Sequence, residues 1–149
     1  MPDISRRSAL RGLVMLLVGP PCATASRCLA TEQVSLAIKG YDPVAYFTVG
    51  KPTPGLPEID YQWDEQRYLF ASVEDRELFK VDPAHYAPQF ANFCAMALTR
   101  GELHVADPEN WLISDGKLYI FEKPVGPELF QQDLPANIAK ANGNRSLVR

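Results

Sequence analysis

The sequence predicts an α+β fold, a small single domain in which two β-hairpins pack against several short helices. Hairpin-like and helix-like patterns follow one another in the order hairpin, helices, hairpin, helices, which is typical of an α+β domain. Hydrophobic residues make up 46% and charged residues 22% of the 149 residues, values typical of one globular domain.

The first hairpin is predicted from residues 59–63 and 68–70, where apolar and polar side chains alternate, with 64–67 as the turn. Before it, residues 37–47 are apolar with one glycine and one proline, and are expected to form an extended lead-in, a turn and a short element. Residues 50–57 hold three prolines and two glycines and are predicted to be a loop.

A helix is expected to follow, with Ser72 as its N-cap and Asp75 completing a pair like that of a capping box. Leu78 and Phe79 are predicted to form its apolar face. Asp82-Pro83 is expected to end this helix and to start a short turn.

The next helix is predicted to begin at Pro88 and to close at Gly101. Its apolar residues fall at the spacing of one face of an amphipathic helix. They are Phe90, Phe93, Cys94, Ala97 and Leu98.

The second hairpin is predicted from the apolar segments 111–113 and 118–121, which flank 114–117 and its Asp-Gly pair. Asp107-Pro108 is expected to break the chain before it. The tail 124–142 is predicted to form one or two helices, broken near Pro135. These helices are expected to pack through Leu129, Phe130, Leu134 and Ile138.

Residues 1–30 are typical of an export signal. They hold four of the fifteen basic residues and one of the eighteen acidic residues. The apolar run 13–18 is too short to span a bilayer, and small residues offer cleavage after Ala25 or Ala30. The mature protein, from residue 31 to 149, is expected to be one domain without a stable membrane anchor.

Residues 5–11, Ser-Arg-Arg-Ser-Ala-Leu-Arg, resemble the bacterial twin-arginine signal, with Ala9 in place of the usual Phe. The resemblance implies a periplasmic or secreted location, with the twin-arginine translocase and signal peptidase as partners during export. The alternative is that Arg6 and Arg7 belong to a general secretory signal, which also implies export.

Motifs along most of the mature chain are similar to those of YHS-domain proteins, in particular the exported branch that includes selenoprotein relatives. The similar segments are 39–47, 68–72, 82–88, 93–95, 107–108 with Trp111, 115–119 and 137–141. Ala45 and Ala71 stand where other YHS domains carry cysteines suspected of metal binding. Ala91-Asn92 stands where the exported branch commonly has two glycines.

Cys94 is the candidate catalytic residue, and the resemblance places it where relatives carry selenocysteine, which implies thiol redox chemistry. The alternative is a small buried hydrophobe. The predicted helix favours that alternative, because Cys94 would lie six residues past Pro88, beyond the first turn, with Arg100 on another part of the helix.

A second alternative is copper or zinc binding, or a metallochaperone role, through His85, His104, Cys94 and Met96. No pair of these residues has a typical metal-binding spacing, so the sequence predicts a loop histidine, a surface histidine and no metal site. No cofactor is predicted.

The function that the sequence favours is an exported module that binds a small ligand or an envelope protein. Aromatic residues are numerous and no catalytic triad, phosphate loop or hydrolase motif is present, so whether the chain is an enzyme stays open. Its net charge of −3 does not favour nucleic acid as a partner. The candidate ligand-binding residues are Tyr41, Asp42, Tyr46, Tyr86 and Trp111, with Tyr61, Trp63 and Tyr68 as further aromatic residues for a pocket or a core.

Overall fold

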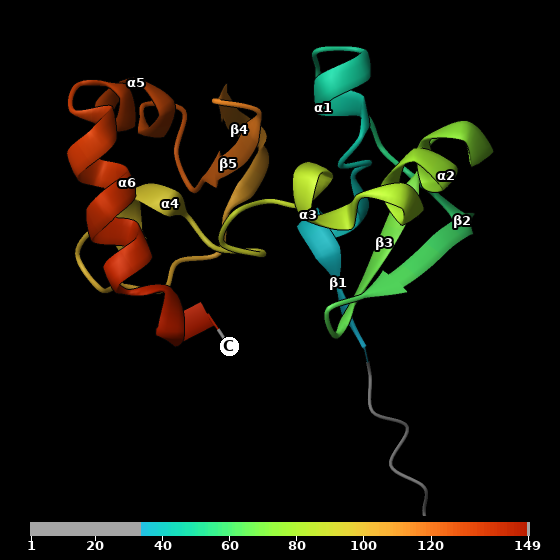
Figure 1. The fold of residues 1–149 in the computed structure, drawn as a ribbon, viewed down its shortest axis with the longest axis horizontal. Coiled ribbons are helices and arrows are strands. Elements are labelled where there is room, and N and C mark those ends of the chain that lie inside the picture. The colour runs from blue at the N-terminus through green and yellow to red at the C-terminus, as the bar shows by residue number, and fades with distance from the viewer. Residues whose placement is uncertain (1–33, 149) are drawn as a thin grey trace, which may run out of the picture. The chain divides into compact units, whose positions relative to one another are not determined.

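The computed structural model describes residues 34–148, and its two hairpins and short helices confirm the predicted α+β fold (Figure 1). No helix within that range is long and apolar enough to cross a membrane. The elements are β1 (Ser35–Leu36), η1 (Ala37–Gly40), α1 (Ala45–Thr48), β2 (Leu56–Trp63), β3 (Gln66–Phe70), α2 (Val73–Val81), α3 (Pro83–Tyr86), α4 (Ala95–Leu98), β4 (Asp107–Ser114), β5 (Lys117–Phe121), α5 (Gly126–Gln131), α6 (Leu134–Gly143) and η2 (Arg145–Val148).

The first sheet has the strand order β1-β3-β2, with β2 antiparallel and β1 parallel to β3. The hairpin was predicted, but its turn consists of two residues only, Asp64 and Glu65, with φ of 48° and 60°. The other two residues of the predicted turn, Gln66 and Arg67, belong to β3. Strand β2 also begins earlier than predicted, at Leu56, inside the predicted loop.

The second sheet is the antiparallel pair β4-β5, and its turn at Asp115-Gly116 confirms the predicted Asp-Gly hairpin. The predicted break at Asp107-Pro108 is wrong, because β4 begins at Asp107. A shift of register between Asp107 and Trp111 accommodates the proline, which has no N–H to donate to a partner strand.

Strand β5 is buried on both faces. Successive side chains of a strand point to opposite sides, so Leu118 and Ile120 join one hydrophobic cluster while Tyr119 and Phe121 join another. The first cluster lies against the first sheet and contains Tyr46, Tyr68, Phe70 and Phe79. The second contains residues of the C-terminal helices, among them Leu98, Phe130 and Ala141.

Helix α2 begins as predicted, because the Ser72 hydroxyl accepts a hydrogen bond from the backbone N–H of Asp75 (3.1 Å). Phe79 is fully buried against four other aromatic rings, as the apolar face requires. Leu78 is not part of that face, since its exposed fraction is 43%. It lies about 100° around the helix from Phe79 and points away from the core.

The predicted helix from Pro88 to Gly101 is wrong, because only Ala95–Leu98 is helical. Backbone N–H groups of this segment bond across to other elements, from Gln89 to the Leu118 carbonyl (2.9 Å) and from Cys94 to the His104 carbonyl (2.8 Å). Of the apolar residues at helical spacing, Phe90, Cys94, Ala97 and Leu98 are buried and Phe93 is half-buried. Tertiary pairing replaces the helix that their spacing suggested.

The tail forms two helices, as predicted. The second, α6, is capped by the Asp133 carboxylate and has Pro135 in its first turn. Phe130 of α5 is fully buried, whereas Leu129 is exposed. Helix α5 contacts both strands of the second hairpin, as Figure 1 shows.

Asp42 joins the N-terminal segment to the end of β3. One oxygen of its buried carboxylate accepts N–H bonds from Val44 (2.8 Å) and Ala45 (3.3 Å), and the other accepts one from Ala71 (2.7 Å). Burial raises the pKa of Asp42 from 3.8 to about 6, although the bonds from Ala71, Val44 and Ala45 act in the opposite direction.

This raised pKa predicts a protein that loses stability as the pH rises. Between pH 3.8 and about 6 the folded state keeps a proton on Asp42 that the unfolded state releases. The free energy of unfolding should therefore fall across this window, by about 3 kcal/mol from this group. Asp42→Asn should weaken the fold but remove this component of the pH dependence in urea titrations.

Glu58→Gln, which makes the same charge change at an exposed position, is the control. Parallel pH profiles for wild type and Asp42→Asn would contradict the prediction.

Candidate functional site

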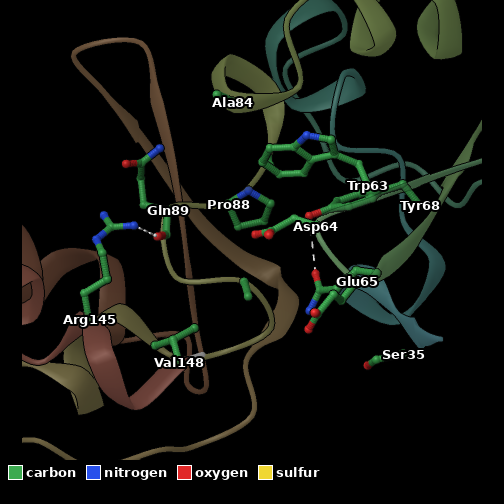
Figure 2. A pocket seen from close by; sticks show the side chains of 13 residues that line it. Ser35, Trp63, Asp64, Glu65, Tyr68, Ala84, Pro88, Gln89, Arg145 and Val148 are labelled. Atoms are coloured by element: carbon green, nitrogen blue, oxygen red, sulfur yellow. Dashed lines mark hydrogen bonds between the residues drawn. The ribbon is translucent and has the colours of Figure 1, made fainter. Parts of the chain in front are cut away.

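A hollow of about 740 Å³ opens between the turn of the first hairpin, the segment after α3 and the C-terminal η2 (Figure 2). We call it the hairpin hollow. Its lining residues are Ser35, Trp63, Asp64, Glu65, Gln66, Tyr68, Ala84, Ala87, Pro88, Gln89, Ala91, Arg145 and Val148.

Aromatic and apolar side chains form one part of this lining. Trp63 ends β2, and its ring meets Phe79 edge-on at 6.0 Å, so the core supports the indole from one side. Figure 2 shows Trp63 and Tyr68 on the side of the hollow opposite Arg145, with Pro88 between them. These groups give a ligand a rigid apolar surface.

Arg145 is held in place at the opposite wall. Its guanidinium donates to the Gln89 carbonyl (2.9 Å) and to the Asn142 side-chain oxygen (2.9 and 3.3 Å), and it lies 4.9 Å from the centre of the Phe90 ring. The side chain is half-buried, and no carboxylate of residues 34–148 lies within 4.0 Å of it. Arg145 is therefore an oriented cation whose contacts are with neutral groups.

Three residues that line the hollow have a left-handed backbone without being glycine. They are Asp64, Glu65 and Ala91, with φ of 48°, 60° and 49°. At Asp64 and Glu65 the two-residue hairpin turn requires this conformation. At Ala91 it costs about 1–2 kcal/mol, and strained positions concentrate at functional sites.

A smaller hollow of about 150 Å³ lies beside Cys94, and we call it the cysteine hollow. Cys94 is the N-cap of α4 and not a mid-helix residue, and its sulfur accepts the N–H of Ala97 at 3.4 Å. Its exposed fraction is 4%. The lining residues are Cys94, Met96, Ala97, Arg100, His104, Glu122, Lys123, Val125, Gly126 and Leu129.

Three side chains that line the cysteine hollow, Arg100, His104 and Glu122, are hydrogen-bonded to ionisable partners. His104 Nδ1 lies 2.8 Å from a carboxylate oxygen of Glu122, and Arg100 donates to Glu102 at 2.8 Å. The bond from His104 lowers the pKa of Glu122, and the bond from Arg100 lowers the pKa of Glu102. The sequence placed Arg100 away from Cys94, but the fold brings Arg100, His104 and Lys123 to the same hollow.

The five candidate ligand-binding residues lie elsewhere, in or beside the first hydrophobic cluster. The buried Tyr46 hydroxyl donates to the Pro108 carbonyl (2.9 Å), and the Tyr46 ring packs edge-on against Trp111 at 5.3 Å. Burial raises the pKa of Tyr46. None of Tyr41, Asp42, Tyr46, Tyr86 and Trp111 lines the hairpin hollow or the cysteine hollow.

Tyr41 and Tyr86, two more of these five, make local contacts. Tyr41 donates to Glu109 (2.7 Å), and this bond raises the pKa of Tyr41. Tyr86 packs edge-on against Phe47 at 5.4 Å. Trp63 and Tyr68, which the sequence offered only as aromatic residues for a pocket or a core, do line the hairpin hollow. Arg145 was missed, because it lies beyond the last recognisable pattern in the tail.

The four residues considered for copper are only partly gathered. Cys94, Met96 and His104 line the cysteine hollow, while His85 packs against Phe47 at 4.9 Å. Among the described residues, no group of three or more histidine, cysteine, aspartate and glutamate side chains is placed to hold a metal ion.

No protein-family model, curated protein or solved structure matches this chain. The similarity to YHS-domain proteins stays an expectation from the sequence motifs, and function has to be argued from the two hollows.

The strain at Ala91 can be measured by substitution. Ala91→Gly should raise the free energy of unfolding by about 0.5–1 kcal/mol, because glycine adopts a positive φ without the clash of a Cβ atom. The control is Ala84→Gly, in the helix α3 at the same hollow, which should lower stability by about 0.5–1 kcal/mol. Equal losses from both substitutions in urea denaturation would refute the assigned strain.

Proposed function

We propose that this protein is an exported small-ligand-binding module and that the hairpin hollow holds the ligand. The observation that carries the proposal is the hollow itself. Its volume of about 740 Å³ falls within the range of small-molecule sites, and it combines a supported indole with an oriented guanidinium. The left-handed backbone of Ala91 on its lining adds support.

The cellular setting of this proposal comes from the leader, which lies outside the described residues. Its Arg6-Arg7 pair and short apolar run support export, by the twin-arginine translocase, to the periplasm or beyond. A soluble ligand of the envelope then meets the hollow directly. An envelope protein that presents such a ligand is the alternative partner.

Ligand binding should be visible at one of the two tryptophans. The indole N–H signals of Trp63 and Trp111 can be followed separately by nuclear magnetic resonance, with Trp63→Phe to assign them. A ligand that raises the melting temperature in a broad screen, or that co-purifies in native mass spectrometry, should shift Trp63 and leave Trp111 in place.

A ligand that shifts Trp111 alone would place binding elsewhere. If nothing co-purifies and no compound raises the melting temperature, the binding-module proposal fails.

Thiol chemistry at Cys94 is the second candidate function. It is favoured by the N-cap position, which gives the sulfur an N–H donor, and by a hollow whose rim carries Arg100, His104 and Lys123. In such chemistry the thiolate attacks one oxygen of a peroxide, the O–O bond breaks, and hydroxide leaves. Cys94 then carries a sulfenic acid, which a thiol of a partner or a small molecule would reduce.

This candidate predicts that hydrogen peroxide adds one oxygen to Cys94 in the native protein, as detected by mass spectrometry with a sulfenic acid trap. Cys94→Ser is the control for the site, and Arg100→Met should slow the reaction because it removes a cation from the rim. A thiol that is silent in the native state and reactive only after unfolding would instead mark Cys94 as a core residue.

A further inference from the structure

We propose that the ligand of the hairpin hollow is a small zwitterion with an apolar body, of the chemical class of hydrophobic amino acids and short peptides. This inference rests on the proposed function and specifies its ligand. The carboxylate would pair with Arg145, the ammonium would face Asp64 and Glu65, and the apolar body would lie against Trp63 and Pro88.

The hydrogen bonding of Arg145 indicates that one end of the ligand is anionic. A guanidinium has five N–H donors, and three hydrogen bonds to Gln89 and Asn142 leave two of them unused. These contacts fix the side chain without neutralising it, since no carboxylate of residues 34–148 pairs with it. A ligand carboxylate is the planar acceptor that such a fork binds best.

The acidic turn of the first hairpin indicates that the other end of the ligand is cationic. Asp64 and Glu65 line the hollow, and in the described part of the chain neither forms an ion pair. Both residues have a left-handed backbone in a two-residue turn. This turn geometry fixes the backbone positions from which the two carboxylate side chains extend. Two adjacent negative charges attract an ammonium and repel a second anionic group, and Trp63 beside them is a further acceptor for a cation.

The middle of the hollow determines the body of the ligand. Figure 2 shows Pro88 between Arg145 on one side of the hollow and Trp63 and Glu65 on the other. Burial of apolar surface against these rings favours a ligand with an aromatic or aliphatic side chain. A polyphosphate would meet repulsion at the acidic turn, and an inorganic anion would leave the apolar surface exposed to water.

The test uses three forms of one dipeptide, phenylalanyl-phenylalanine. The free dipeptide is a zwitterion, its N-acetyl form keeps only the carboxylate, and its C-terminal amide keeps only the ammonium. Titration of the mature protein, followed at the Trp63 indole with Trp111 as internal reference, should show the free dipeptide binding about tenfold or more tightly than either derivative, or about 1.4 kcal/mol.

Substitutions on each side of the hollow test which residues bind the carboxylate and which bind the ammonium. Arg145→Met should weaken binding of the free dipeptide toward that of the amide and leave the amide unchanged. Asp64→Asn with Glu65→Gln should weaken the free dipeptide and leave the N-acetyl form unchanged. Lys51→Met removes an exposed cation outside the hollow and should change neither.

The outcomes separate the two proposals. Equal affinity of the three forms at Trp63, or the same loss of all three in Arg145→Met, overturns the zwitterion and leaves the binding module. If no dipeptide form shifts the Trp63 signal while ligands from the screen do, the zwitterion inference is wrong and the binding-module proposal stands. If no compound shifts Trp63, both proposals fall.

Discussion

The burial of β5 on both faces is the constraint on which the rest of this structure depends. A strand with apolar side chains on both sides is stable only if each side is covered, and this chain covers one side with the first sheet and the other with the C-terminal helices. The two hydrophobic clusters therefore share a single hairpin. The order of elements in the chain, with the first sheet before this hairpin and the C-terminal helices after it, supplies the two covers.

The same strand fixes the hairpin hollow. Pro88 bridges to Leu118 of β5, and the N–H of Gln89 bonds to the Leu118 carbonyl. The segment that would otherwise form a helix is thus drawn along the strand, and its next residues turn through the strained Ala91. Asn92 then ties this loop to the N-terminal segment, accepting from Ile38 N–H (2.6 Å) and donating to the Leu36 carbonyl (3.0 Å).

The proposed binding at the hairpin hollow relies on groups that are already held in place in the structure. Arg145 is oriented by neutral partners, Trp63 is supported by Phe79, and the acidic turn is fixed by its two-residue geometry. Preorganised groups of this kind lose little entropy when they bind, so a hollow open to solvent can still discriminate between ligands by charge. The cysteine hollow differs, since its Arg100, His104 and Glu122 side chains already have hydrogen-bonded partners and its thiol is nearly covered.

The fold class and the local signals were predictable from sequence. The Asp115-Gly116 turn, the Ser72 cap and the start of α6 near Pro135 depend on residues within a few positions of one another, and short-range chemistry determines them. The candidate site was less predictable. The five residues chosen for a ligand lie by the core, because aromatic side chains that fill a core and those that line a pocket have the same sequence pattern.

The sequence by itself determined that this is an α+β domain with two hairpins, and where its sharpest turns and caps fall. Only the tertiary structure decided that the segment from Pro88 to Cys94 pairs with other elements and that Cys94 caps a helix. It also decided that Arg145 and Trp63 lie on opposite sides of one hollow, as Figure 2 shows. The physical reason is that hydrogen bonds to distant partners compete with local helix formation, and the sequence of a segment does not contain the position of those partners.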